Sequence, residues 1–220
     1  MAGLYGMRTG PLRRVSLTVL LLLAFGVGLV SLRYLSGDPA VVPPSMQASF
    51  LANGWIFVMH TTASAIALMV GAVQFLAALR RRWPMVHRWA GRCYVACCAA
   101  GAFSAFWIAP DVESGPVATA GFSALAFAWI GVTVVAWRHA VARRVDCHRR
   151  WMLRSFALTA AAISLRIQLL VFEVLGFDYD QTSALLSFSC WLPNVVLAEM
   201  MLWWMRRRGM ESEAVPDTVS

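Results

Sequence analysis

Residues 51–79 read LANGWIFVMHTTASAIALMVGAVQFLAAL, a run that contains no Asp, Glu, Lys or Arg. A helix that crosses the hydrocarbon core of a bilayer needs about 20 predominantly apolar residues. The run is longer than that, so it predicts a transmembrane helix that tilts or emerges from the bilayer. Similar runs recur along the chain and predict six spans, at roughly 15–35, 51–79, 93–110, 118–138, 151–174 and 183–205.

The composition points to the same class of protein. Of the 220 residues, 60% are hydrophobic and 14% are charged, whereas soluble domains average about 45–50% apolar and about 25% charged residues. The first apolar run is longer than the core of a signal peptide and no small-x-small site follows it, so we expect an uncleaved helix. The sequence therefore predicts an all-α polytopic transmembrane helical bundle, a single integral membrane domain over residues 1–220.

The net charge is +8, and the positions of the basic residues along the chain indicate the membrane topology. All 19 basic residues are Arg, and 17 of them fall on one predicted side of the membrane, in the segments 8–14, 80–92, 138–154 and 206–208. The other side carries Asp38, Asp111, Glu113, Asp178 and Asp180. The positive-inside rule then predicts a multi-pass protein of the cytoplasmic (inner) membrane with both termini in the cytoplasm. We expect contacts with the lipid bilayer and with anionic headgroups at that face, and no nucleic acid partner. Protein partners stay open.

Two blocks of sequence resemble each other. Residues 86–95 read VHRWAGRCYV and residues 146–155 read DCHRRWMLRS. When His87 is aligned with His148, Arg, Trp and a further Arg follow each, and each block opens a helix that runs outward. Spans two and three therefore look like a hairpin related to spans four and five. Arg and Trp are typical of the membrane interface, but interfacial anchoring does not require His, which leaves a structural and a functional role open for both histidines.

Polar residues also recur inside two predicted spans. Asn53, His60 and Gln74 are spaced by multiples of seven, as are Arg166 and Glu173, and residues seven apart share one face of a helix. His60 and Arg166 both fall about 12–13 Å below the outer end of their span. Ionisable residues at such depth generally face the bundle interior. We therefore predict an outer intramembrane polar site of His60, Arg166, Asn53 and Glu173, with helix-packing contacts as the alternative.

A second polar group is predicted at the inner face. Glu199 lies about 9 Å from the inner end of span six, close to the level of Arg154, so we expect these two residues to pair. With His87, His148 and Arg92 they form the candidate inner-face site. His87 and His148 are the candidate metal ligands.

Three stretches of the chain resemble a known family. They are MHTTASAIALMVGAVQFL (59–76), RRRWPMVHRWAGRCYV (80–95) and HRRWMLRSFALTAAAISLR (148–166). They are similar to the bacterial predicted membrane protein family called domain of unknown function 2306, over about residues 55–170. The resemblance implies a multi-span membrane protein whose recurrent positions are His60, His87, Arg88, Gly91, Arg92, His148, Trp151, Arg154 and Arg166. It implies no reaction.

Three functions fit these residues. The first is a redox protein with haem b, because His is a common haem ligand and Arg can bind propionates. His60 has no histidine at its level, so His87 and His148 are the pair that matches. The second is a small transporter or proton-coupled conduit lined by polar stripes, although broken helices are not evident apart from Pro193-Asn194. The third is a non-catalytic factor that binds lipid or a protein partner. No HExxH motif is present, and whether the protein is an enzyme stays open.

Overall fold

The computed structural model describes residues 11–111 and 115–213, and these residues form helices and no strands. Six helical stretches of this part are long and apolar enough to cross a membrane. They are Arg14–Ser36, Met46–Val73, Pro84–Ile108, Gly115–Val141, Val145–Val174 and Tyr179–Arg207. The prediction of an all-α bundle with six spans is confirmed.

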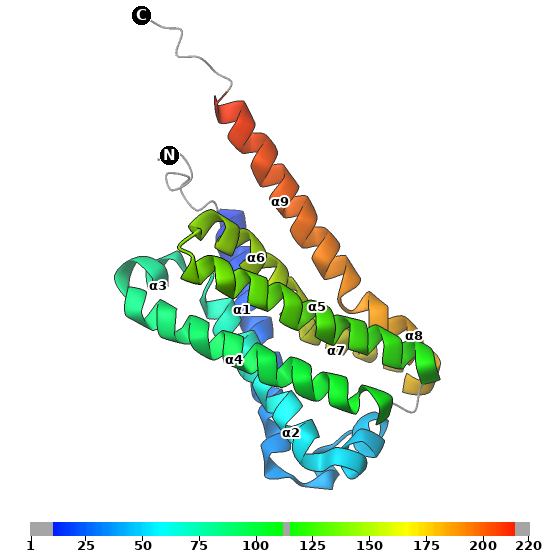
Figure 1. Cartoon of the computed structure of the whole chain (residues 1–220). Coiled ribbons are helices and arrows are strands. Elements are labelled where there is room, and N and C mark those ends of the chain that lie inside the picture. The colour runs from blue at the N-terminus through cyan, green and yellow to red at the C-terminus, as the bar shows by residue number, and fades with distance from the viewer. Residues whose placement is uncertain (1–10, 112–114, 214–220) are drawn as a thin grey trace, which may run out of the picture.

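The helices form one bundle (Figure 1). In chain order they are α1 (Pro11–Ser31), η1 (Leu32–Ser36), η2 (Pro39–Val41), α2 (Pro44–Val73), α3 (Ala77–Arg82), α4 (Pro84–Ile108), η3 (Ala109–Asp111), α5 (Gly115–Val141), α6 (Val145–Thr159), α7 (Ala161–Val174), α8 (Tyr179–Ser189) and α9 (Leu192–Glu213). Helix α2 packs against α1 and α4, while α5 packs against α4, α6 and α8. Helix α9 packs on α6 and extends beyond the rest of the bundle.

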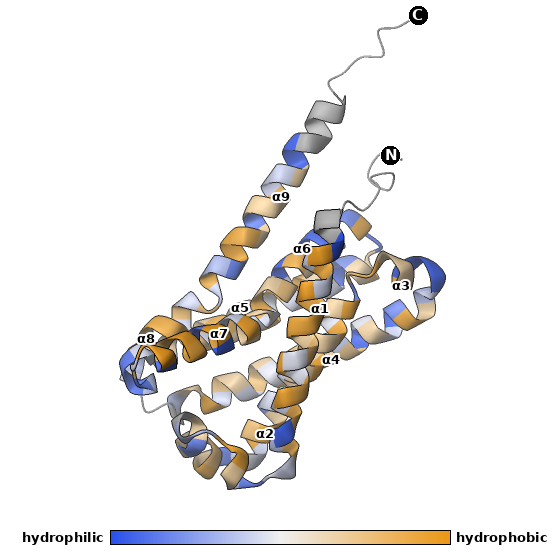
Figure 2. Cartoon of the chain, turned by 180° about the vertical axis from the view of Figure 1, so that it is seen from behind, coloured by the Kyte–Doolittle hydropathy of each residue, from blue (hydrophilic) through white to orange (hydrophobic). Residues whose placement is uncertain are grey.

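The two ends of the bundle differ in charge. One end, here called the arginine end, holds the α3–α4 and α5–α6 turns with Arg80, Arg81, Arg82, Arg143 and Arg144. The opposite, acidic end holds Asp38, Asp111, Asp178 and Asp180. Figure 2 shows hydrophilic residues gathered around α3 at one end and α8 at the other. Large apolar side chains between these ends are exposed, as a lipid-facing surface requires.

Three predicted spans have boundaries that differ by six or more residues in the structure, and span five is one of them, since it begins at Val145 and not at 151. Helix α4 begins at Pro84, nine residues before the predicted start at 93, so His87 and Arg92 lie inside the helix. Proline is favoured at the first helical position, and the basic residues that follow it lower the local hydropathy, which hid the true start. Helix α2 ends at Val73 rather than 79, and Gln74 caps it instead of continuing the polar stripe.

In the described part of the chain three of the six spans are broken, and the sequence indicated one of these breaks, at Pro193-Asn194. Helix α2 has a residue with non-helical backbone angles, Asn53 (φ −146°, ψ 58°). Span five is interrupted at Ala160, between α6 and α7. Span six is interrupted between α8 and α9, close to the predicted kink. The cause there is Pro193, which has no N–H to donate to Ser189 O.

Side chains satisfy the backbone groups near these breaks. Gln168 Nε2 donates to Ser189 O over 3.1 Å, and Ser189 Oγ donates to Gln168 Oε1 over 2.6 Å. Beside the break in span five, Asn194 Nδ2 donates to Ala157 O over 3.3 Å. In a bilayer no water is at hand for such groups, so these amides stabilise the interrupted helices.

A hydrogen-bonded network lies at the centre of the bundle. The Tyr94 hydroxyl lies 2.8 Å from both Ser155 Oγ and Thr159 Oγ1. Trp129 Nε1 donates to Thr159 Oγ1 over 2.9 Å, and Thr133 Oγ1 lies 2.7 Å from Ser155 Oγ. Tyr94 is fully buried, so its ring and hydroxyl belong to the core of the bundle. The network joins α4, α5 and α6.

Candidate functional site

A cavity of about 780 Å³ lies in the half of the bundle toward the acidic end. Residues of α1, α2, α5, α7 and α8 contribute to its wall. His60, Arg166 and Glu173, predicted from the sequence to share an outer site, all line it. Asn53 is not among the lining residues; it lies at the kink of α2. The structure therefore brings three of the four predicted residues to one cavity.

Arg166 extends from α7 into this cavity, where it is held by two hydrogen bonds. Its Nη1 donates to Ala162 O over 3.0 Å, and its Nη2 donates to Ser31 Oγ over 2.7 Å. Over the described ranges no carboxylate oxygen lies within 4.0 Å of the guanidinium. Glu173, predicted for the same site, lines the cavity but is exposed and does not pair with Arg166. The positive charge of Arg166 therefore faces the cavity.

His60, on α2, is also held in place by a hydrogen bond. Its Nδ1 lies 2.9 Å from Gly101 O, and because a carbonyl oxygen only accepts, Nδ1 carries the hydrogen. Nε2 then has a lone pair, and within residues 11–111 and 115–213 it has no hydrogen-bond partner. The lack of a side chain at Gly101 also lets Ser64 and Trp129 pack closely here, since a Cβ there would lie 3.0 Å from Ser64 Oγ and from the Trp129 ring.

Ser64 adds a further unsatisfied polar atom to the cavity wall. Its Oγ is buried and has no partner in the described part of the chain. Buried hydroxyls are normally hydrogen-bonded, so such an atom calls for an explanation. Ser31, which holds Arg166, and Gly101, which holds His60, were missed by the sequence reasoning. Neither has a periodic or charged signature that could have revealed it.

The predicted pairing of Arg154 with Glu199 at the arginine end is confirmed. Arg154 donates from Nε to Glu199 Oε1 and from Nη2 to Glu199 Oε2, the latter over 2.8 Å. The two side chains are 18% and 48% exposed. Arg154 also lies over the Trp151 ring, with its Cζ 4.8 Å from the centroid. Arg92, predicted for the same site, is exposed and lies over the ring of Trp89.

The two histidines of the repeated blocks bond in a similar way. His87 Nδ1 pairs with Gln74 Oε1, and Gln74 Nε2 donates to His87 O over 3.0 Å. His148 Nδ1 lies 2.9 Å from Ala136 O. The two rings are close enough for their charges to interact. No group of three or more His, Cys, Asp or Glu residues that could hold a metal ion occurs in the described segments.

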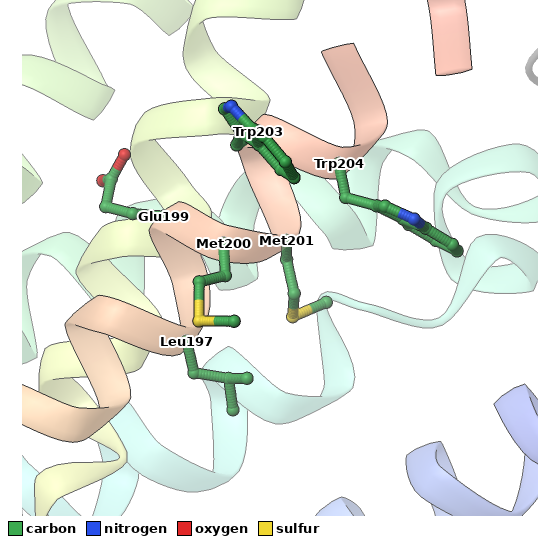
Figure 3. Close-up of a pocket in the computed structure, with 6 residues that line it drawn as sticks. All are labelled: Leu197, Glu199, Met200, Met201, Trp203 and Trp204. Atoms are coloured by element: carbon green, nitrogen blue, oxygen red, sulfur yellow. The ribbon is translucent and has the colours of Figure 1, made fainter. Parts of the chain in front are cut away.

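A second, shallow hollow lies on α9 beside Glu199, the partner of Arg154. Figure 3 shows its six residues on successive turns, with Glu199 and Trp204 on different sides of the helix. Apart from Glu199 the side chains are apolar or aromatic: Leu197, Met200, Met201, Trp203 and Trp204. Such a surface suits contact with lipid tails rather than recognition of a polar ligand.

Comparison with known proteins agrees with this architecture. Residues 57–202 match the family model described as "Predicted membrane protein (DUF2306)". The chain belongs to this family. The match confirms the resemblance seen in the sequence and extends it through α8 to Glu199, while Ser31 lies outside it. No curated protein and no solved structure matches the chain. The family description names a membrane protein and gives no reaction. The cavity is the feature of the structure that bears on function.

Proposed function

We propose that the protein binds an amphipathic organic anion in its intramembrane cavity. The observation that carries this proposal is the charge of Arg166, which faces the cavity with no carboxylate beside it in the described chain. A charged side chain in the middle of a membrane costs about 2.5–3.5 kcal/mol on insertion scales. An anionic ligand offsets this cost, and an apolar ligand body suits the remainder of the wall.

The dimensions and the donors of the cavity agree with such a ligand. Its volume of about 780 Å³ falls within the range of about 300–1,000 Å³ typical of small-molecule sites. The planar guanidinium binds carboxylates and phosphates through paired N–H groups, and Ser31 holds it in place. Leu68, Leu125 and Leu169 supply apolar surface. Ser64 Oγ offers a second hydrogen bond.

A binding measurement in nanodiscs tests the proposal. The probe is a spin-labelled fatty acid, and a spin-labelled alkylammonium of the same length is the cationic control. We expect Arg166→Gln to weaken fatty-acid binding about 10- to 100-fold, the value of one charged hydrogen-bonded contact. Arg166→Lys retains part of the affinity, and Arg207→Gln at the arginine end retains all of it. Equal binding of both probes, or no effect of Arg166→Gln, would refute the proposal.

Transport is the second use that this cavity supports. Two of the three broken spans are interrupted at residues next to it, since Thr159, Ala161 and Cys190 line the wall. Interrupted helices at a central binding site are a feature of many transporters. Uptake of the fatty acid into proteoliposomes, lost in Arg166→Gln, is the expected result. Binding without uptake would limit the protein to a binding role.

A redox function is the alternative at the arginine end, with haem b or a metal ion between His87 and His148. What supports it is that each Nδ1 is bonded within the protein, which leaves each Nε2 as the atom for a metal. Metal-bound histidines usually donate their other ring N–H in this manner. A haem absorption band lost in both His87→Ala and His148→Ala tests it, and a band that survives both excludes it.

The membrane and the orientation are part of the proposal. We place the protein in the inner membrane with the arginine end and both termini in the cytoplasm. Three stacked pairs supply a basic aromatic surface for anionic headgroups: Arg92 with Trp89, Arg154 with Trp151, and Arg207 with Trp203. The sequence gives no sign of a nucleic acid partner, and protein partners are not assigned.

A further inference from the structure

We infer that the amphipathic anion is haem b, with His60 Nε2 as the axial ligand of the iron and Arg166 as the partner of a propionate. This inference rests on the proposed function, because it names the ligand class for the same cavity. It differs from the redox alternative in its residues and in its place, since His87 and His148 lie at the other end of the bundle.

The bonding of His60 is the first argument. Its Nδ1–H donates to Gly101 O over 2.9 Å, which fixes the tautomer and the orientation of the ring. This is the second-shell arrangement that metal-bound histidines use. His60 also lines the cavity, and its Nε2 has no partner among the residues described. The atom left over is the one that coordinates iron.

The charges along the cavity give the second argument. Haem is an apolar macrocycle with two propionates at one edge, so its site needs an axial ligand and a cation at a separate place. Arg166 lines the same cavity and is close enough to His60 for their charges to interact. Three carboxylates, those of Glu173, Asp178 and Asp180, also line the cavity. All three are exposed, so water screens their repulsion of the second propionate.

The rest of the wall suits a flat apolar ring. Aromatic side chains from several elements line the cavity, namely Tyr34, Phe57, Phe122, Trp129 and Phe172. A porphyrin supplies four nitrogen ligands itself, so one histidine suffices. No second histidine lines the cavity in the described chain. The sixth position of the iron then receives no imidazole from the described chain. Met46 and Cys190 also line the wall, so addition of carbon monoxide tests whether a sulfur ligand fills that position.

Haem reconstitution of the purified full-length protein in detergent tests the inference. We expect about one haem per chain and a ferrous spectrum that shifts on addition of carbon monoxide. His60→Ala should lower haem content at least tenfold, and imidazole added to His60→Gly should restore the axial ligand and the spectrum. His139→Ala is the matched control, because this fourth histidine is not among the lining residues. Arg166→Gln should weaken haem binding without changing the axial-ligand spectrum.

The outcomes separate the two proposals. Haem that disappears in His87→Ala and His148→Ala but persists in His60→Ala would overturn the inference and favour the arginine end. A protein that binds the fatty-acid probe through Arg166 but takes up no haem would refute haem while the proposed function stands. A protein that binds neither ligand would refute both. If His60→Gly loses haem and added imidazole does not restore haem binding, ligation by His60 is refuted as well.

Discussion

Replacement of Gly71 by Ala tests how tightly the core beneath the cavity is packed. Gly71 lies on α2, where a Cβ would be 2.7 Å from Tyr94 Cε2 and 2.8 Å from Phe156 Cδ2. Tyr94 and Phe156 are 0% and 5% exposed, so neither ring can turn away into free space. The Tyr94 ring also carries the hydroxyl that joins Ser155 and Thr159. The added methyl group must therefore push α2 away or disturb the network.

The magnitude follows from two opposing effects. Overpacking of a core costs about 1–3 kcal/mol, whereas Gly→Ala inside a helix gains about 0.5–1 kcal/mol. The middle values of these ranges give a net destabilisation of about 1.25 kcal/mol. For a chain of this length about 1 kcal/mol shifts Tm by about 2–4 °C, so we expect Tm to fall by about 2.5–5 °C.

The matched control is Gly131→Ala, because a Cβ at Gly131 in α5 meets no atom within 4 Å. That variant should have an unchanged or slightly higher Tm, since it adds the helix-propensity gain without a clash. Tm is measured from tryptophan fluorescence during heating in one detergent, with size-exclusion chromatography as a check on folding. If Gly71→Ala is as stable as Gly131→Ala, the close packing of α2 against Tyr94 and Phe156 is wrong.

Two further predictions concern the core and the topology. Tyr94→Phe removes the hydroxyl that joins Ser155 and Thr159. This change should lower the free energy of unfolding by about 1 kcal/mol and Tm by about 2–4 °C in the same assay. An unchanged Tm would show that the network does not stabilise the bundle. A reporter fused after Arg144 should report a cytoplasmic position, and one fused after Phe177 the opposite side. The reverse pattern would overturn the proposed orientation.

The number of spans and the Arg154–Glu199 pair could be predicted from the sequence because both depend on local properties. An apolar run of sufficient length has few alternatives to a transmembrane helix. Both Arg154 and Glu199 lie near one end of their spans, so a count at 1.5 Å per residue places them at one level. Their bidentate pairing in the structure follows from that shared depth.

The break in span five could not be predicted because tertiary contacts stabilise it, whereas Pro193 indicated the kink in span six. Ala160 is surrounded by strong helix formers, and Asn194, which bonds beside this break, comes from a different span. Gln74 was predicted to continue the polar face of span two, and this prediction was wrong for a related reason. The helix ends before it, and its side chain bonds His87 in the next helix. Sequence spacing describes one helix at a time, whereas both contacts join two helices.

Polar groups inside the bundle fall into two sets, and the division between them favours a ligand over packing. Tyr94 and its partners satisfy one another, as helix-packing contacts do. In the described chain Arg166 has no carboxylate beside it, although Ala162 O and Ser31 Oγ accept hydrogen bonds from it. Nε2 of His60 and Oγ of Ser64 have no hydrogen-bond partner there, and all three residues line the cavity. Thr62 Oγ1 is the exception, because it is also unsatisfied but does not belong to the wall.

Polar groups retained for helix packing alone would be spread through the bundle and paired, because an unsatisfied polar group in hydrocarbon costs several kcal/mol. Their convergence on one cavity is what a binding site requires.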